Sequence, residues 1–257
     1  MRRSRRLALL FPSVALALTL AAAPAHAADP VDYVAMGDSY SSGAGAPPYG
    51  LCFQSAAAYG PRWAATHDVS SFLFTACGGV TSQQMGPQFL ALSDRTDLVT
   101  ITIGGNDVGF INVVLGCVTG TDAQCTAAVD QAVRSGETTL PGRLDATYAT
   151  IEKRAPRAEV VVLGYPRLVE PDGACLTPSK RADLNRGADA LHEVISDRAA
   201  AAGVAYVDVR DHFAGHGACG PDPWINPFSA ARIVESFHPN RDGYAKGYLA
   251  LLNSVTD

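Results

Sequence analysis

Five short apolar runs recur along the chain, and each is bounded by glycine, proline or polar turn residues. They are rich in Val, Ile and Phe, which is typical of strands buried in a parallel sheet. The predicted strands are Val31–Met36, Val69–Phe74, Asp97–Ile103, Glu159–Leu163 and Val204–Val209.

Stretches with helical character fill the gaps between these runs. The predicted helices are Arg143–Arg154, Lys180–Ala202 and Asp242–Leu252, and apolar residues of the second recur every three or four positions. Strands that alternate with helices predict an α/β fold, a three-layer α/β/α sandwich around a five-stranded parallel sheet. Two stretches, Gly109–Thr139 and His212–Phe237, resist assignment to a helix or a strand. Both are rich in loop residues and contain cysteine, and irregular backbone of that length usually needs a disulfide or a function.

The first 27 residues have the pattern of a secretory signal peptide: a cluster of arginines, an apolar run, and Ala25-His26-Ala27 as the cleavage site. The paired arginines leave the twin-arginine export route open beside the general one. The apolar run is short for a membrane span, and no later segment is long and apolar enough for one. We therefore expect a secreted, extracellular protein in which residues 28–257 form a single domain without an integral membrane segment.

Removal of the signal peptide leaves an acidic protein. The chain has 20 basic and 25 acidic residues, and four of the basic ones lie in the signal peptide, so the mature formal charge is 16 − 25 = −9. An acidic chain without a basic stripe is a poor nucleic-acid binder. Charge would not draw it to an anionic membrane either. We expect a monomer that binds no nucleic acid.

All six cysteines follow the signal peptide. An even number outside the cytosol predicts three disulfides. The absence of a C-x-x-C pair argues against a metal or redox site, while the pairing itself stays open at this point. The cysteines are Cys52, Cys77, Cys117, Cys125, Cys175 and Cys219.

Three successive predicted strands end in groups suited to acyl transfer. The first runs into GDSY at 37–40, which contains Ser39 as a candidate nucleophile. The second ends at CGG, 77–79, where Gly79 can expose its N–H, and the third at GGND, 104–107, where Asn106 offers an amide donor. Each motif alone is also typical of an ordinary turn. Carboxyl ends of parallel strands meet at one edge of a sheet, so we expect these groups to lie together.

A histidine completes this set. His238 lies in ESFHP at 235–239, on the last loop before the closing helix. By contrast, His212 and His216 lie in a glycine-rich loop rather than on one helix face, which argues against a metal there. A serine needs a base to become nucleophilic, and a tetrahedral intermediate needs hydrogen-bond donors. The sequence therefore predicts a serine acyl-transfer site.

These four motifs together resemble the SGNH (GDSL) hydrolase superfamily, in particular the secreted lipases, phospholipases and esterases of actinobacteria. The resemblance covers essentially the whole mature chain and implies a flavodoxin-like α/β/α fold with no metal and no organic cofactor. It implies that Ser39 is the nucleophile, that His238 is the base, and that Ser39, Gly79 and Asn106 form the oxyanion hole. Similar members pair their cysteines in chain order, which implies Cys52–Cys77, Cys117–Cys125 and Cys175–Cys219.

One position departs from the family pattern. The superfamily usually has Asp three residues before the histidine, where this chain has Glu235. The Glu235 carboxylate is one candidate for orienting the imidazole. Because some relatives use a backbone carbonyl instead, the carbonyl groups of Glu235 and Ser236 are the alternatives.

The expected function is hydrolysis of carboxylic esters of lipid or acyl substrates through an acyl-enzyme on Ser39. A carbohydrate acetyl esterase or an acyltransferase with the same site is the alternative, and a binding domain on the same fold is a third reading. No lid helix is apparent. The apolar residues expected to receive an acyl chain are Tyr49, Leu51, Phe110, Val113 and Val114.

Overall fold

The computed structural model describes residues 29–257, so the predicted signal peptide at 1–27 lies outside the described residues. One sheet of five parallel strands runs in the order β2-β1-β3-β4-β5. The strand that follows β1 in the chain, β2, lies on one side of it, and all later strands lie on the other side. Such a reversal of strand order opens a crevice at the carboxyl ends of β1 and β3. The strands are β1 (Val31–Gly37), β2 (Val69–Phe74), β3 (Leu98–Thr102), β4 (Glu159–Leu163) and β5 (Ala205–Val207).

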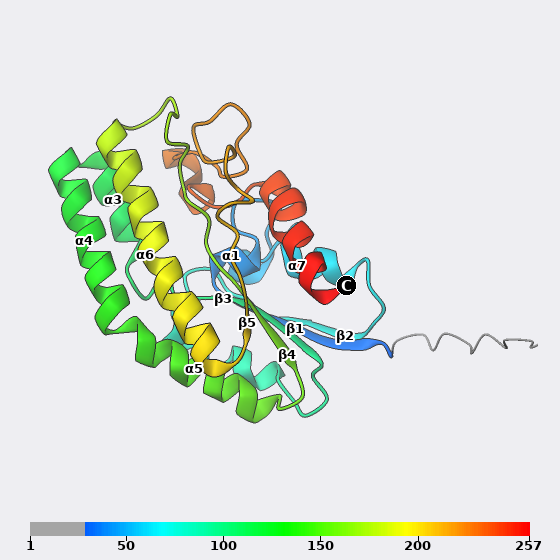
Figure 1. The fold of residues 1–257 in the computed structure, drawn as a ribbon. Helices are drawn as coiled ribbons and strands as arrows, with labels where there is room; N and C mark the ends of the chain where they lie inside the picture. Colours follow the sequence, from blue (N-terminus) through cyan, green and yellow to red (C-terminus); the bar gives the residue numbers. More distant parts are fainter. Residues whose placement is uncertain (1–28) are drawn as a thin grey trace, which may run out of the picture.

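Helices cover both faces of this sheet, which confirms the predicted three-layer α/β/α sandwich (Figure 1). Each predicted strand is found, with its ends moved by at most two residues. The helices of one face are α3 (Phe110–Thr119), α4 (Asp122–Thr138), α5 (Leu140–Arg154) and α6 (Pro178–Ala202). The opposite face carries α2 (Tyr59–Ala64), a π-helical turn (Gly243–Tyr248) and α7 (Leu249–Thr256).

The expectation of irregular backbone over Gly109–Thr139 is wrong, because α3 and α4 occupy this stretch. A capping box starts α4: the N–H of Gln124 donates to the Thr121 hydroxyl, and the N–H of Thr121 donates to the Gln124 side chain at 2.7 Å. The buried positions have helical spacing but hold mostly small residues, so their apolar signal along the sequence is weak. These positions are Cys125, Val129, Ala132 and Gly136.

The other loop-rich stretch, His212–Phe237, is largely irregular, and its helical part is a short 3₁₀ segment, Ala230–Glu235.

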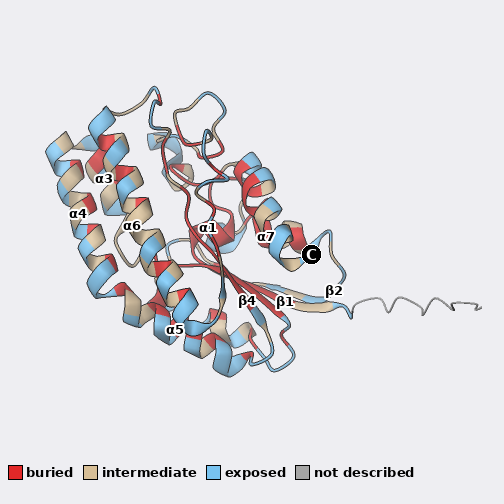
Figure 2. Ribbon diagram, viewed as in Figure 1, coloured by how far each residue is buried: buried red, intermediate tan, exposed pale blue. Residues whose placement is uncertain are grey.

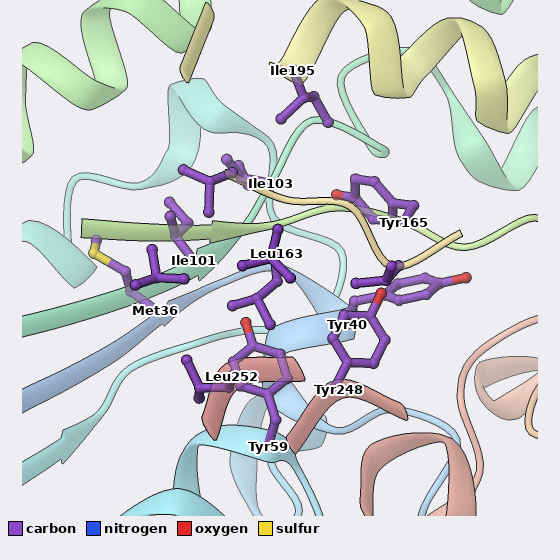
Figure 3. Packing of buried hydrophobic residues seen from close by; sticks show 14 of the residues in the cluster. Met36, Tyr40, Tyr59, Ile101, Ile103, Leu163, Tyr165, Ile195, Tyr248 and Leu252 are labelled. Carbon is purple, nitrogen blue, oxygen red and sulfur yellow. The ribbon is translucent and has the colours of Figure 1, made fainter. Parts of the chain in front are cut away.

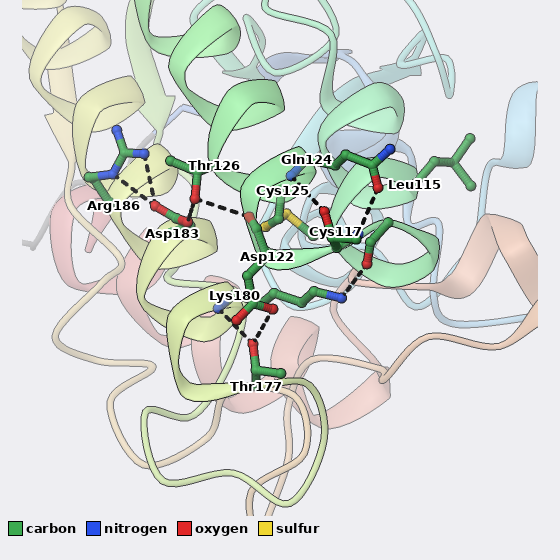
Figure 4. Close-up of a disulfide and its surroundings, with 12 residues drawn as sticks. Leu115, Cys117, Asp122, Gln124, Cys125, Thr126, Thr177, Lys180, Asp183 and Arg186 are labelled. Carbon is green, nitrogen blue, oxygen red and sulfur yellow. Dashed lines mark hydrogen bonds and ion pairs between the residues drawn. A yellow bond between two sulfur atoms is a disulfide. The ribbon is translucent and has the colours of Figure 1, made fainter.

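Three disulfides join the six cysteines in chain order, as the resemblance implies. Figure 4 shows the Cys117–Cys125 disulfide, which joins α3 to α4. Cys52–Cys77 ties the segment before α2 to the end of β2, next to the predicted oxyanion glycine.

The buried residues lie in the sheet and on the inner faces of the helices (Figure 2). Below the carboxyl edge of β1 and β3, the core is rich in tyrosine (Figure 3). The rings of Tyr59 and Tyr248 stack with centroids 5.4 Å apart, and those of Tyr40 and Tyr165 meet edge to face at 4.9 Å. Since a buried hydroxyl requires a hydrogen-bond partner, these tyrosines also connect loops of the site that are far apart in sequence.

Candidate active site

Ser39 lies where β1 passes directly into a one-turn helix, α1 (Ser39–Ser42). The carboxylate of Asp38 caps this turn by accepting the backbone N–H of Tyr40 at 2.9 Å. Gly37 has a φ of 119°, and a Cβ at this position would collide with the backbone of Thr102 on β3. Only glycine fits this turn, which places the serine hydroxyl at the carboxyl edge of the sheet.

The imidazole of His238 connects Ser39 to a backbone carbonyl. Its Nε2 lies 2.7 Å from the Ser39 Oγ, and its Nδ1 lies 3.0 Å from the carbonyl oxygen of Ser236. Because a carbonyl oxygen only accepts, the neutral ring carries its proton on Nδ1 and accepts the serine hydroxyl at Nε2. This is the tautomer that a general base for serine requires.

Burial keeps this ring neutral. The exposed fraction of His238 is 7% and that of Ser39 is 9%. Loss of water around the ring lowers the pKa of His238 from its usual 6.5 to about 4, while the hydrogen bond to Ser236 acts in the opposite direction. At neutral pH the imidazole is therefore free to take a proton.

Two residues outside the predicted set hold the histidine loop against the nucleophile turn. The hydroxyl of Tyr40 donates to the carbonyl of Phe237 at 2.6 Å. Asn226 exchanges backbone hydrogen bonds with Phe237 and His238, each at 2.9 Å, and its side chain donates to the carbonyl of Gly45 at 2.9 Å. The sequence carries Tyr40 next to the nucleophile but no signal for Asn226, which lies in an irregular loop.

The Glu235 carboxylate does not contact the imidazole. Its Oε2 lies 3.7 Å from Nε of Arg232, and no hydrogen bond between residues 29 and 257 joins it to the His238 ring. The reason is the local backbone: Glu235 ends a 3₁₀ segment and the chain then bends back, with the N–H of His238 donating to the Glu235 carbonyl at 3.1 Å. The candidates for orienting the ring were the Glu235 carboxylate and the carbonyl groups of Glu235 and Ser236. In the structure, the Ser236 carbonyl lies against Nδ1.

This geometry predicts that Glu235→Gln lowers kcat/KM by less than about tenfold, whereas loss of a true triad acid costs about 10⁴-fold. The reason is that Ser236 keeps its carbonyl on the ring in this variant. The measurement is hydrolysis of p-nitrophenyl butyrate at neutral pH, with Arg232→Gln as the control that removes the other half of the ion pair. A loss of several hundred-fold in Glu235→Gln alone would assign the orienting role to the carboxylate.

The predicted oxyanion groups lie in the same cleft as Ser39 and His238. Gly79 has a φ of 84°, a left-handed conformation that favours glycine. Asn106 donates one amide hydrogen to the carbonyl of Val80 at 3.0 Å, and an amide has a second one to offer. Within the part of the chain that the structure describes, the N–H groups of Ser39 and Gly79 have no acceptor.

A buried carboxylate, Asp107, links the loops that carry these donors. Asp107, whose side chain is 1% exposed, accepts the N–H and the hydroxyl of Ser82 at 2.9 and 2.6 Å and Arg143 at 3.1 Å. It therefore joins the loop after β2 to the loop after β3 and to α5. The GGND motif contains this residue, but the sequence did not indicate its partners.

A second buried carboxylate, Asp38, couples the nucleophile turn to the Asn106 loop. The hydroxyl of Tyr165 donates to Asp38 and accepts the N–H of Gly105 at 3.0 Å. Burial raises the pKa of Asp38 to about 7, against the effect of its hydrogen bonds from Tyr165 and Tyr40. Tyr165 follows β4 in the chain, and nothing in its sequence context marked it.

The cleft above Ser39 has a volume of about 200 Å³ and mostly apolar walls. Phe110 and Val114 line it as expected, whereas Tyr49, Leu51 and Val113 do not. A second, much smaller apolar cavity of about 50 Å³ lies against α4 and α6, and Phe110 lines both. Since Phe110 begins α3, the cleft has a helical wall that the sequence reading lacked. Three residues outside that reading also line the cleft: Phe53, Ile111 and Ile233.

The remaining loop histidines have structural partners. Nε2 of His212 lies 2.8 Å from the carbonyl oxygen of Lys246, and the His216 ring stacks on Trp224 with centroids 3.7 Å apart. Over residues 29–257, no group of three or more potential metal-ligating side chains comes together. In the same range, no helix has the length and apolar character of a bilayer span.

Comparisons with known proteins show the family of the chain. The model of the GDSL-like Lipase/Acylhydrolase family matches residues 35–246. The chain is 43% identical to a lipase of Streptomyces rimosus, with 100% of both chains covered, and 43% identical to lipase 1 of Streptomyces coelicolor, with 99% and 100% covered.

Solved structures of similar proteins have the same fold. The crystal structure of the extracellular lipase from Streptomyces rimosus superposes with a TM-score of 0.85, covering 88% of this chain and 100% of that one. A phospholipase A1 from Streptomyces albidoflavus is 45% identical, with a TM-score of 0.82 and 86% and 98% of the two chains covered. The protein therefore belongs to the GDSL-like lipase/acylhydrolase family and is a carboxylic ester hydrolase.

Proposed function

We infer that the protein is a secreted lipase or esterase that cleaves acyl esters of lipids through an acyl-enzyme on Ser39. The observation that carries this inference is the hydrogen bond of 2.7 Å between the Ser39 Oγ and the His238 Nε2, with the ring held by the Ser236 carbonyl. The extracellular lipase among the relatives and the three disulfides support secretion.

The proposed reaction has two halves. Ser39 attacks the ester carbonyl as His238 takes the hydroxyl proton, and the N–H groups of Ser39 and Gly79 with the Asn106 amide bind the oxyanion. The imidazolium then gives its proton to the departing alcohol. In the second half, His238 takes a proton from water, the hydroxide attacks the acyl-enzyme, and the proton returns to the Ser39 oxygen as the acid leaves.

The shape of the cleft supports a medium or long acyl chain over an acetyl group. Its walls are mostly apolar, and Phe110 lines both the cleft and the second, smaller apolar cavity. An acetyl esterase would need a short, closed acyl site. The two relatives solved by crystallography, a lipase and a phospholipase A1, favour lipid esters, including phospholipids, as the substrates.

The test is hydrolysis of p-nitrophenyl esters from acetate to palmitate by residues 28–257, the predicted mature chain. We expect kcat/KM to rise beyond acetate and to reach its maximum at a medium or long chain, because each buried methylene contributes about 0.8 kcal/mol. Ser39→Ala provides the background rate. A sharp maximum at acetate would favour the carbohydrate acetyl esterase, and inactivity of folded protein on every ester would favour an acyltransferase.

The pH profile provides a second test. Because the pKa of His238 is lowered to about 4, the neutral base survives in mild acid, and kcat/KM of the free enzyme falls only as pH drops through that value. The measurement is kcat/KM against pH in wild type and in Asp38→Asn, with circular dichroism at each pH to follow folding. A limb near pH 7 that disappears in Asp38→Asn would belong to Asp38. A limb near 6.5 in both proteins would contradict the lowered pKa of His238.

A further inference from the structure

Exposed apolar side chains gather around the mouth of the cleft. Eight large apolar residues of the described chain are exposed, and three of these, Phe53, Ile111 and Ile233, line the cleft itself. Leu51, which is 88% exposed, lies two residues before Phe53, and Leu115 lies one helical turn beyond Ile111 on α3. We call these five residues the apolar rim. The other three, Leu73, Leu90 and Val255, belong to other parts of the fold.

Two of the three segments that carry the rim lack charged residues, whereas the segment of Ile233 contains Arg232 and Glu235. No charged residue occurs between Ser39 and Pro61, nor between Val108 and Thr121, in a chain of which 18% is charged. A cluster of exposed apolar side chains is costly in water and marks a site of contact with another apolar phase. Its position around the substrate cleft connects that contact with the substrate.

The rim is held in place before any partner arrives. Cys52, between Leu51 and Phe53, is bonded to Cys77, and Cys117 of α3 is bonded to Cys125 of α4. In Figure 4 the side chain of Leu115 points away from this disulfide. Two of the three rim segments are thus anchored by disulfides while their apolar side chains stay exposed.

We propose that the apolar rim docks on a zwitterionic phospholipid surface, so that the mouth of the cleft faces the acyl chains. This proposal rests on the proposed function. An anionic surface would repel the predicted mature chain, whose formal charge is −9. Arg232 precedes Ile233 in the chain, and its side chain is 69% exposed although its Nε lies 3.7 Å from the Glu235 carboxylate. The exposed guanidinium has further N–H groups to offer a lipid phosphate, a group that a triglyceride droplet lacks.

The experiment measures binding to phosphatidylcholine vesicles by flotation for three proteins. They are the wild type, the rim variant Leu51→Glu/Leu115→Glu, and the control Leu90→Glu/Val255→Glu, which has the same change in charge at exposed sites away from the mouth. The substituted rim residues do not line the cleft. Hydrolysis of dissolved p-nitrophenyl butyrate is measured in parallel.

We expect the rim variant to lose at least about tenfold in vesicle affinity, because apolar burial in the interface supplies the binding energy. The control variant should bind like the wild type, and all three proteins should hydrolyse dissolved butyrate within about twofold. Equal vesicle binding by the rim variant and the wild type would overturn the proposal. So would a wild type that binds only triolein droplets or only anionic vesicles. Vesicle binding by a wild type without any esterase activity would overturn the proposed function and leave the docking surface supported.

Discussion

Ser39→Ala lowers kcat for ester hydrolysis by about six orders of magnitude, the scale of removing a serine nucleophile that acts with a histidine. The Ser39 Oγ is the hydroxyl on Nε2 of His238, and its neighbours are engaged elsewhere. The hydroxyl of Ser41 bonds to Tyr59 at 2.6 Å, and that of Ser42 donates to the Ser39 carbonyl at 3.2 Å. Neither neighbour is therefore placed to replace the missing hydroxyl.

The measurement combines initial rates on p-nitrophenyl butyrate with labelling by an organophosphonate. The matched control is Ser236→Ala, which removes a hydroxyl beside His238 but keeps the backbone carbonyl on Nδ1, and it should retain activity within about tenfold of wild type. Retention of more than about a hundredth of the wild-type rate by Ser39→Ala would show that another residue is the nucleophile. Labelling of that variant would lead to the same conclusion.

His238→Gln has an effect of similar size, a loss of about five to six orders of magnitude in kcat. Glutamine fills much of the same space, but its amide cannot take the Ser39 proton, so the nucleophile remains a weakly reactive alcohol. Labelling of Ser39 by the organophosphonate should be lost together with hydrolysis. The variant is chosen over alanine because His238 is buried against Tyr40, with ring centroids 5.1 Å apart.

The control for this variant is His212→Gln, the same exchange at an exposed histidine that packs near Trp224 and contacts the carbonyl of Lys246. It should leave kcat within about twofold of wild type, as is usual for surface exchanges. A loss of less than about a hundredfold in kcat for His238→Gln, together with a larger loss for His212→Gln, would contradict His238 as the general base. The base would then have to lie near His212.

Most of the sheet could be read from the sequence because its signal is local. Buried parallel strands are continuous apolar runs, and β1 and β4 show this directly. The helices α3 and α4 could not be predicted from the sequence. The inner face of α4 is built from small residues such as Ala132 and Gly136, which give a weak apolar pattern. That face is buried only by its contacts with α3 and α6, and a short stretch of sequence cannot show these contacts.

The chemical groups divide in a similar way. Glycine-rich turns directly after strands predicted that Ser39, Gly79 and Asn106 would meet, because parallel strands end at one edge. The role of Glu235 was not predictable, since it depends on where a bend of the backbone points two neighbouring groups. With a φ of 56° at Phe237, the chain brings the Ser236 carbonyl, and not the Glu235 side chain, to the imidazole.

By itself, then, the sequence determined the parallel sheet, the family, the even set of cysteines and the candidates for the reacting groups, all of which follow from local patterns and motif order. The tertiary structure alone decided which atom orients His238, how far burial lowers its pKa, and how Tyr165 links Asp38 to the Asn106 loop. It also decided that exposed apolar residues of three separate segments, Phe53, Ile111 and Ile233, line one cleft. These properties arise from burial and from contacts between residues distant in the chain, and such contacts exist only once the chain has folded.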